Sequence, residues 1–292
     1  MKLRSMTGFG SAEASNARIS VKAELKSLNG KFMDLNMRLP RNLQNKEIAL
    51  RRELTKRIER GSATLFVNIE RNTESAEANL LNTEMARKLF AEIQQLQQSI
   101  GTESGNILDR VLAFPGVINA DEVEELEDED WQLVEATVYK AFDAFDAFRV
   151  DEGASLKGEL KQMVENIQAA LPGVEQYEGE RINTLRERIR TQLNNTVGEE
   201  SVDKDRFEQE MIYYLEKIDF SEEKSRLIQH CKYFTDTLEK EPNGKKLGFI
   251  SQEMGREINT LGAKAAHFHI QQQVVIMKDE LEKIKEQVNN VL

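Results

Sequence analysis

The chain has 292 residues and a formal net charge of −11; 39% of its residues are hydrophobic and 31% are charged. This length suffices for one large domain or two ordinary ones, and the composition excludes an intrinsically disordered protein. No apolar run approaches the roughly 20 residues that cross a bilayer, and the N-terminus has no apolar signal segment, so we expect no membrane association. Cys231 is the only cysteine, which excludes an intramolecular disulfide and a cysteine-based zinc cluster; we expect a cytoplasmic protein.

The charge is unevenly distributed along the chain. Residues 1–72 carry 15 Lys and Arg against 7 Asp and Glu, a net charge of +8, whereas residues 73–130 carry 3 against 14. An acidic total by itself argues against a nucleic acid partner. A basic N-terminal region within an acidic chain nevertheless leaves room for a local anion-binding surface.

The first 39 residues are predicted to form strands. The segment ARISVKAELKSLN alternates apolar and polar residues from Ile19 to Leu25, and KFMDLNMRL alternates in the same way before Pro40. This period of two is typical of strands with one buried face. Asn29-Gly30 between the two segments is a strong signal for a two-residue hairpin. We therefore expect an antiparallel sheet.

A helix over residues 42–60 and a fourth strand, SATLFVNIER, are predicted next. The helix and the residues before it carry a group of basic side chains: Arg38, Arg41, Arg51, Arg52, Lys56, Arg57 and Arg60. Cations at these spacings form a patch on which a phosphate backbone could lie, and Arg38, Arg41 and Arg52 are the candidate residues for binding it. An ordinary solvated helix is the alternative.

The rest of the chain is predicted to be mainly helical. An amphipathic helix over 82–100 is followed by a short helix that ends before Pro115-Gly116. Long helices are expected over 131–170, 173–197, 203–218, 221–240, 244–262 and 266–291, with interruptions at Pro172 and Pro242. The predicted fold class is α+β: an N-terminal antiparallel sheet with a helix, followed by long antiparallel helices. We divide the chain into domains at residues 1–160 and 161–292.

The helix over 221–240 carries the first group of residues suited to chemistry. Glu223, Arg226 and His230 stand at i, i+3 and i+7, so they share one face of the helix. A carboxylate, a guanidinium and an imidazole on one face suit phosphate binding, metal binding or proton transfer. An ordinary solvated face with a Glu222–Arg226 pair is the alternative.

The segment 244–265, GKKLGFISQEMGREINTLGAKA, carries the second group. Apolar residues from Leu247 to Ala265 recur every three or four positions and predict a buried stripe. On the other face, Glu253 and Glu257 are i, i+4 neighbours that could hold a divalent cation, and Lys264 could meet a phosphate. The alternative is again a solvated face.

His267 and His269 follow directly. Residues at i and i+2 share a face only in an extended segment, so only there could one metal ion bind both; two separate surface histidines are the alternative. The sequence contains no Walker phosphate loop, dinucleotide-binding glycine motif, nucleophile elbow or zinc-protease motif. The common nucleotide-binding, hydrolase and zinc-protease signatures are therefore excluded.

Three segments resemble the YicC/YloC family of endoribonucleases. They are SMTGFG at 5–10, ELKSLNGKFMDLNMRLP at 24–40 and the segment 244–265 described above. The resemblance implies a cytoplasmic endoribonuclease that cleaves single-stranded RNA with a divalent metal ion, Mg²⁺ or Mn²⁺. It also implies a homo-oligomer, a ring-like hexamer around an RNA channel.

The matching positions carry the roles that the resemblance implies. Those positions are Glu223, Arg226, His230, Lys245 or Lys246, Gln252, Glu253, Arg256, Glu257, Asn259 and Lys264. The chain departs from the family where Lys26 and Lys31 stand in place of arginine, which keeps the charge but loses bidentate phosphate contact. It departs again after Lys264, where acidic or amide residues are usual and this chain has Ala266, His267 and His269.

These observations give a hypothesis and a rival. Glu223, His230, Glu253 and Glu257 would hold the metal and supply catalysis, while Arg226, Arg256, Asn259 and Lys264 would bind the RNA. The rival is a non-catalytic RNA-binding or adaptor oligomer that acts with other ribonucleases. A third possibility is that the same residues form an interface between subunits.

Overall fold

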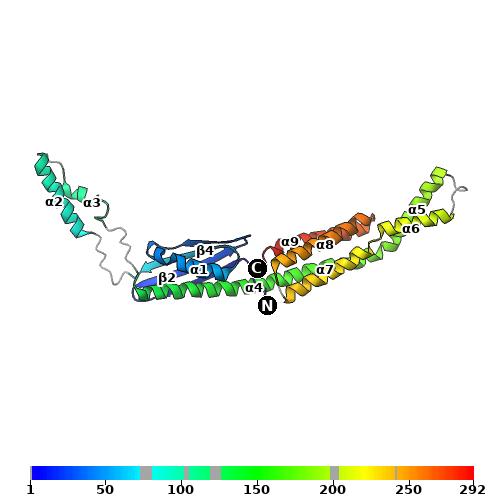
Figure 1. Ribbon diagram of the computed structural model, residues 1–292, viewed down its shortest axis with the longest axis horizontal. Coiled ribbons are helices and arrows are strands. Elements are labelled where there is room, and N and C mark those ends of the chain that lie inside the picture. Colours follow the sequence, from blue (N-terminus) through cyan, green and yellow to red (C-terminus); the bar gives the residue numbers. More distant parts are fainter. Residues whose placement is uncertain (1, 73–80, 102–104, 119–125, 198–203, 241) are drawn as a thin grey trace.

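The computed structural model describes residues 2–72, 81–101, 105–118, 126–197, 204–240 and 242–292 of an elongated molecule (Figure 1). The strands are β1 (Gly8–Ser15), β2 (Ile19–Leu28), β3 (Met33–Arg38) and β4 (Gly61–Arg71). The helices are the 3-10 helix η1 (Arg41–Lys46), α1 (Glu47–Ile58), α2 (Thr83–Ile100), α3 (Ile107–Leu112), α4 (Asp128–Gln176), α5 (Glu178–Val197), α6 (Lys204–Ile218), α7 (Ser221–Lys240), α8 (Gly244–Lys264) and α9 (Phe268–Val288). The predicted α+β fold class is confirmed.

The sheet is mixed rather than antiparallel throughout. Its strand order is β1-β2-β4-β3, with β1 and β4 antiparallel to β2, and β3 parallel to β4. The predicted hairpin at Asn29-Gly30 is wrong, because β4 lies between β2 and β3. A two-residue type I′ hairpin requires positive φ at both central residues, and neither Asn29 nor Gly30 adopts it. Gly30 instead allows close approach to β4: a Cβ there would lie 2.9 Å from the backbone nitrogen of Ser62.

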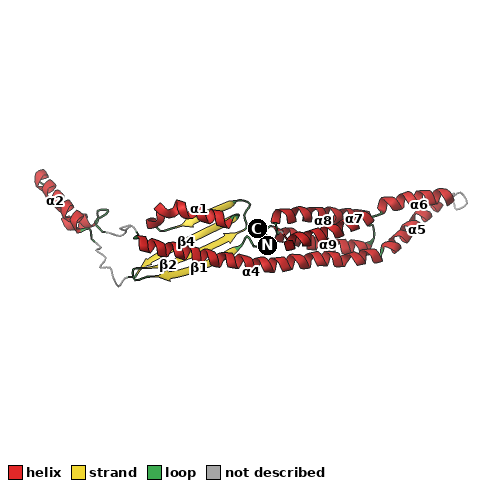
Figure 2. Cartoon of the chain, turned by 60° about the horizontal axis from the view of Figure 1, so that its bottom comes forward, coloured by secondary structure: helices red, strands yellow, loops and turns green. Residues whose placement is uncertain are grey.

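One face of the sheet packs against α1 and the first part of α4 (Figure 2). The alternating residues of β2 that were predicted to be buried, Ile19 to Leu25, lie in this core. Strand β1 approaches α4 very closely, because a Cβ on Gly10 would lie 2.2 Å from the carbonyl oxygen of Ala141. Gly10 of the SMTGFG segment therefore lets the strand and the helix pack backbone against backbone, and Gly8 leaves room for the side chain of Phe145.

Helix α4 passes through both cores of the molecule. Val134 to Phe145 lie in the sheet core, and Leu156 to Val174 lie in the core of a helical bundle with α7, α8 and α9. The predicted interruption at Pro172 is wrong, because α4 continues to Gln176. A proline inside a helix removes one backbone hydrogen bond, but the neighbouring Leu171 and Val174 are buried in the bundle, which stabilises the continuous helix. The predicted domain division at residue 160 stays a prediction.

The two ends of the described chain meet where the sheet and the bundle join (Figure 1). The backbone N–H of Met6 donates to the carbonyl of Asn290, and that of Leu292 donates to the carbonyl of Arg4. Helices α5 and α6 extend beyond the bundle at one end, and α2 and α3 lie beyond the sheet at the other. Among the described helices, none is both long enough and apolar enough to cross a membrane.

Candidate functional site

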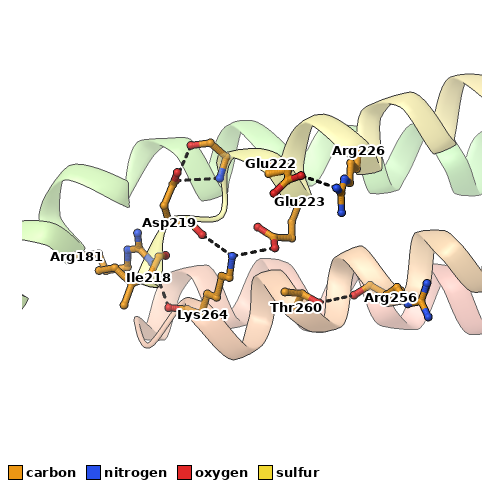
Figure 3. A network of polar contacts seen from close by, with 10 residues as sticks. Arg181, Ile218, Asp219, Glu222, Glu223, Arg226, Arg256, Thr260 and Lys264 are labelled. Atoms are coloured by element: carbon orange, nitrogen blue, oxygen red, sulfur yellow. Dashed lines mark hydrogen bonds and ion pairs between the residues drawn. The ribbon is translucent and has the colours of Figure 1, made fainter. Parts of the chain in front are cut away.

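An ion pair joins α7 to α8 at one end of their contact (Figure 3). The ammonium of Lys264 donates to Oε1 of Glu223 at 2.9 Å and to the carbonyl oxygen of Asp219 at 2.8 Å. The Glu223 side chain is only 10% exposed, whereas that of Lys264 is 30% exposed. Lys264 thus supplies an ion-pair partner to a carboxylate that is almost completely removed from water.

The second oxygen of this carboxylate has no partner. Oε2 of Glu223 is buried and accepts no hydrogen bond from any described residue. A buried carboxylate oxygen that accepts nothing is costly unless a further group binds it. Glu223 therefore has one oxygen available for a further bond, which a cation or a water molecule would complete.

The corner between α6 and α7 holds Lys264 in position. Oδ1 of Asp219 accepts hydrogen bonds from the hydroxyl and the backbone N–H of Ser221, at 2.7 and 3.0 Å. These hydrogen bonds, with the nearby charge of Lys264, hold the pKa of Asp219 below its ordinary value. A fixed corner keeps the Asp219 carbonyl directed at the lysine.

Arg181 of α5 fixes the same corner from the other side, and the sequence analysis missed it. Its Nη1 donates to the carbonyls of Ile218 and Lys264, at 3.1 and 3.2 Å, and its guanidinium lies 4.4 Å from the ring centroid of Phe220. Burial lowers the pKa of Arg181. Nothing in its spacing distinguishes it from the exposed arginines of α5, because its partners are backbone carbonyls of distant segments.

The two predicted arginines remain on the surface beside this ion pair. Arg226 pairs with Glu222 at 2.5 Å, and Arg256 pairs with Glu253 at 3.2 Å. The side chains of Arg226 and Arg256 are 54% and 73% exposed. Exposed pairs within one helix contribute little stability, so a phosphate could replace either carboxylate at low cost.

His230 and Glu257 lie between two contacts that align α7 with α8. Glu223 meets Lys264 at one end, and Lys246 lies 5.1 Å from the ring centroid of Tyr233 at the other. His230 is half-buried and Glu257 is 5% exposed. Within the described part of the chain, Glu257 takes part in no hydrogen bond or ion pair. Its carboxylate is therefore a second one that could bind a further group. Asn259 of α8 is exposed.

The described residues contain no group of three histidine, cysteine or acidic side chains arranged to hold a metal ion. Mg²⁺ commonly binds one or two carboxylates and takes its other ligands from water and substrate phosphates. The free oxygen of Glu223 is a single carboxylate ligand of the kind that this mode of binding uses, and Glu257 of α8 is a second carboxylate without a described partner.

The two later histidines stack on one tyrosine. The rings of His267 and His269 lie 5.6 and 4.6 Å from that of Tyr177, and 5.7 Å from each other. His267 has extended backbone before α9 and lies 3.8 Å from Glu180, while His269 contacts Gln272. These aromatic contacts account for the position of both rings in the fold.

The basic residues of the N-terminal domain lie on a separate surface. Arg38, Arg41 and Arg52 are exposed and form no ion pair with any other described residue. They belong to the sheet and its covering helices, whereas Arg226, Arg256 and Lys264 belong to the bundle (Figure 1). The structure thus brings Glu223 and Lys264 together and leaves the first three arginines apart from them.

Comparison with known proteins relates the whole chain to one family. Residues 3–158 match the family described as "Endoribonuclease YicC-like, N-terminal region", and residues 174–292 match "Endoribonuclease YicC-like, C-terminal". A "Probable endoribonuclease YicC" of Haemophilus influenzae is 32% identical over 300 residues, and one of Clostridioides difficile is 28% identical over 290. Each alignment covers 98% of this chain and 99% of the relative. The resemblance seen in the sequence is therefore confirmed, and the chain belongs to the family of YicC-like endoribonucleases.

Proposed function

We propose that this protein is an endoribonuclease that cleaves single-stranded RNA by metal-assisted hydrolysis at the surface between α7 and α8. The observation that carries the proposal is the Glu223 carboxylate, which is almost buried, paired through one oxygen with Lys264 and free at the other. Membership of the YicC-like family and the names of the two relatives support the endoribonuclease activity.

The side chains named above would have separate roles in this activity. Arg226, Arg256 and Lys264 would neutralise the scissile phosphate and the charge that develops on it (Figure 3). The exposed Asn259 of α8 would contact the RNA. The exposed Arg38, Arg41 and Arg52 would guide the strand electrostatically. His230 or a carboxylate would accept the proton of the attacking water.

A divalent cation, Mg²⁺ or Mn²⁺, would be held by Glu223 and Glu257, with Glu253 and His230 as further candidate ligands. When bound, such an ion polarises a phosphoryl oxygen and increases the acidity of bound water. Glu253 would have to exchange its pair with Arg256 to take part. The released Arg256 would then be available to the phosphate.

The assembly and location of the protein belong to the same proposal. A homo-oligomer, a hexamer as the family resemblance implies, would place several copies of the α7–α8 surface around one RNA. The compartment would be the cytoplasm, where single-stranded RNA is available and a lone buried thiol such as Cys231 stays reduced.

A labelled single-stranded RNA tests the activity directly. Wild type, Glu223→Gln and Glu257→Gln are compared in a titration with Mg²⁺ and Mn²⁺, with Glu165→Gln on α4 as a matched exposed carboxylate. We expect cleavage to need the metal and to fall at least a hundredfold in the first two variants only. Undiminished cleavage by both variants would remove the role proposed for this surface.

The rival function is a non-catalytic RNA-binding oligomer acting with other ribonucleases. It is favoured by the small number of metal ligands on this surface, because no three histidine, cysteine or acidic side chains of the described residues are grouped to hold a metal ion. Purified protein that binds the RNA but leaves it intact in both metals would establish this rival and exclude the enzyme.

A further inference from the structure

A basic pocket lies where the sheet meets the helical bundle. It encloses about 810 Å³ between the β2–β3 and α1–β4 connections on one side and the ends of α8 and α9 on the other. Its lining includes four cations, two phenylalanines and no acidic residue. The residues that the argument uses are Lys31, Phe32, Arg60, Lys245, Phe249 and Lys285.

The charge of this pocket is opposite to that of the whole chain. In a chain of net charge −11, four cations line one hollow without a carboxylate among the lining residues. Lys31, Arg60 and Lys245 form no ion pair with any residue that the structure describes, and only Lys285 is paired, with Glu282 at 2.7 Å. Unpaired cations gathered in a concave site raise the local concentration of anions.

The two phenylalanines are unusually exposed for their size. Phe32 is 75% exposed and Phe249 is 59% exposed, and the ammonium of Lys31 lies 5.5 Å from the ring centroid of Phe32. Exposed rings beside cations are the combination that binds single-stranded nucleic acid, because bases stack on the rings while the cations follow the phosphates. Free phosphate or an acidic peptide would leave the rings unused.

The start of α8 adds backbone donors to the pocket. Asn243 caps the helix through the backbone N–H of Lys246, which leaves the amides of Gly244 and Lys245 without an intrahelical acceptor. Both residues line the pocket. The positive end of the helix therefore adds to the attraction that the side chains exert on a phosphate.

The pocket connects with the α7–α8 surface along one face of α8. Lys245, Phe249, Gln252 and Arg256 follow one another at spacings of four, three and four, so they form one exposed stripe. With a rise of 1.5 Å per residue, this stripe spans about 16 Å from Lys245 to Arg256. One extended strand lying along α8 would therefore contact both the pocket and Arg256.

We propose that this pocket is a second RNA-binding site, which holds unpaired bases of a single strand between Phe32 and Phe249 while its cations bind the adjoining phosphates. The inference rests on the proposed function, because it takes RNA as the ligand, and it assigns to the junction a role separate from cleavage. The pocket sets the distance between the held bases and the phosphate at the α7–α8 surface.

Binding of a short fluorescent single-stranded RNA to the full-length protein in EDTA tests the proposal without cleavage. The double variant Phe32→Ala/Phe249→Ala is compared with Phe268→Ala, whose ring is 71% exposed on α9 outside the pocket. Lys31→Ala/Lys245→Ala is compared with Lys278→Ala, an exposed lysine of α9. We expect both pocket variants to bind at least tenfold more weakly and both controls to bind as wild type.

Binding equal to that of wild type in both pocket variants would overturn the proposal. Unchanged RNA binding with a changed oligomeric state, measured by light scattering, would also overturn it and identify the pocket as a contact between copies. The cleavage assay of Glu223→Gln keeps the two proposals distinguishable. If the wild-type protein never cuts RNA but the pocket variants bind RNA more weakly than wild type, the pocket stands as an RNA-binding site and the proposed endoribonuclease activity is excluded.

Discussion

Lys264 holds a carboxylate that is almost completely removed from water. Without the lysine, the Glu223 carboxyl group would lose its partner at a position where its side chain is 10% exposed. Removing one partner of a fully buried pair costs about 3–5 kcal/mol, and the partial exposure of Lys264 reduces that figure here. We predict that Lys264→Met lowers the free energy of unfolding by about 2 kcal/mol, measured by urea denaturation.

Substitution of the other member of the ion pair, Glu223, serves as the control. In Glu223→Gln, the lysine keeps its hydrogen bond to the Asp219 carbonyl and can extend its ammonium toward water. Its loss of stability should therefore be under about 1 kcal/mol, and the double variant should recover most of the cost of Lys264→Met. Equal losses of unfolding free energy in the two single variants would contradict the conclusion that Lys264 is needed to stabilise the buried Glu223 carboxylate.

Asp219 makes the stability of the α6–α7 corner depend on pH. The hydrogen bonds from Ser221 depress its pKa in the folded state, so the folded chain binds a proton more weakly than the unfolded chain. The resulting stability is full above the unfolded pKa and is lost as the pH falls through the folded pKa. We predict that Asp219→Asn is less stable than wild type at neutral pH and that the difference shrinks below about pH 4.

Urea unfolding from pH 7 to pH 3 measures this difference. Asp143→Asn on α4, an exposed aspartate, is the matched control and should show no such dependence. A difference between wild type and Asp219→Asn that stays constant across the range would show that the carboxylate charge does not stabilise the corner.

The contact between β1 and α4 depends on a missing side chain. A Cβ on Gly10 would lie 2.2 Å from the carbonyl oxygen of Ala141 and 2.3 Å from the backbone nitrogen of Phe145. Backbone atoms cannot rotate away, so the helix would have to move off the strand. We predict that Gly10→Ala lowers the free energy of unfolding by about 3 kcal/mol or more, measured by urea denaturation.

Gly158 in the same helix provides the control, because a Cβ there meets nothing within 4 Å. Gly158→Ala should raise stability by about 1 kcal/mol, since alanine favours a helix interior. A loss of less than about 1 kcal/mol in Gly10→Ala would mean that the strand and helix can separate freely, and would remove this reason for the glycine in the SMTGFG segment.

Periodicity predicted the elements well and their partners poorly. The alternation of Ile19 to Leu25 and the stripe from Leu247 to Ala265 each indicate a buried face, and both faces are buried. The signal at Asn29-Gly30 was misleading because the local turn competes with the insertion of β4, a strand that begins about 30 residues later. Pro172 was misread because the burial of its neighbours outweighs its local cost.

In the candidate site, too, the residues on one helix could be predicted from the sequence, but their partners on other helices could not. The spacing of Glu223, Arg226 and His230 indicated a shared face, but it could not indicate that Lys264 of another helix binds Glu223. Arg181 was missed because its partners are the backbone carbonyls of Ile218 and Lys264. The junction pocket was missed for a similar reason, since its lining comes from opposite ends of the chain.

Helix α4 joins the sheet to the helical bundle, so the junction pocket and the cations of the α7–α8 surface belong to one continuous structure. Its first part packs on the sheet and its later part packs in the bundle, while the two chain ends pair across the junction. The pocket at this junction therefore depends on both cores. RNA held there and at the α7–α8 surface would be positioned by the whole molecule rather than by one domain.

The salt dependence of RNA binding measures how many phosphates the cations of the protein neutralise. A chain of net charge −11 gains little from long-range attraction, so affinity has to come from local contacts with cations. Each phosphate contact with a single strand contributes about 0.7 to the slope of log K against log salt. We predict that Lys31→Ala/Lys245→Ala reduces this slope by about 1.4, whereas Lys278→Ala leaves it unchanged. The slope is obtained from fluorescence anisotropy in EDTA at 50–300 mM salt, and an unaltered slope in the double variant would mean that these two lysines contact no phosphate.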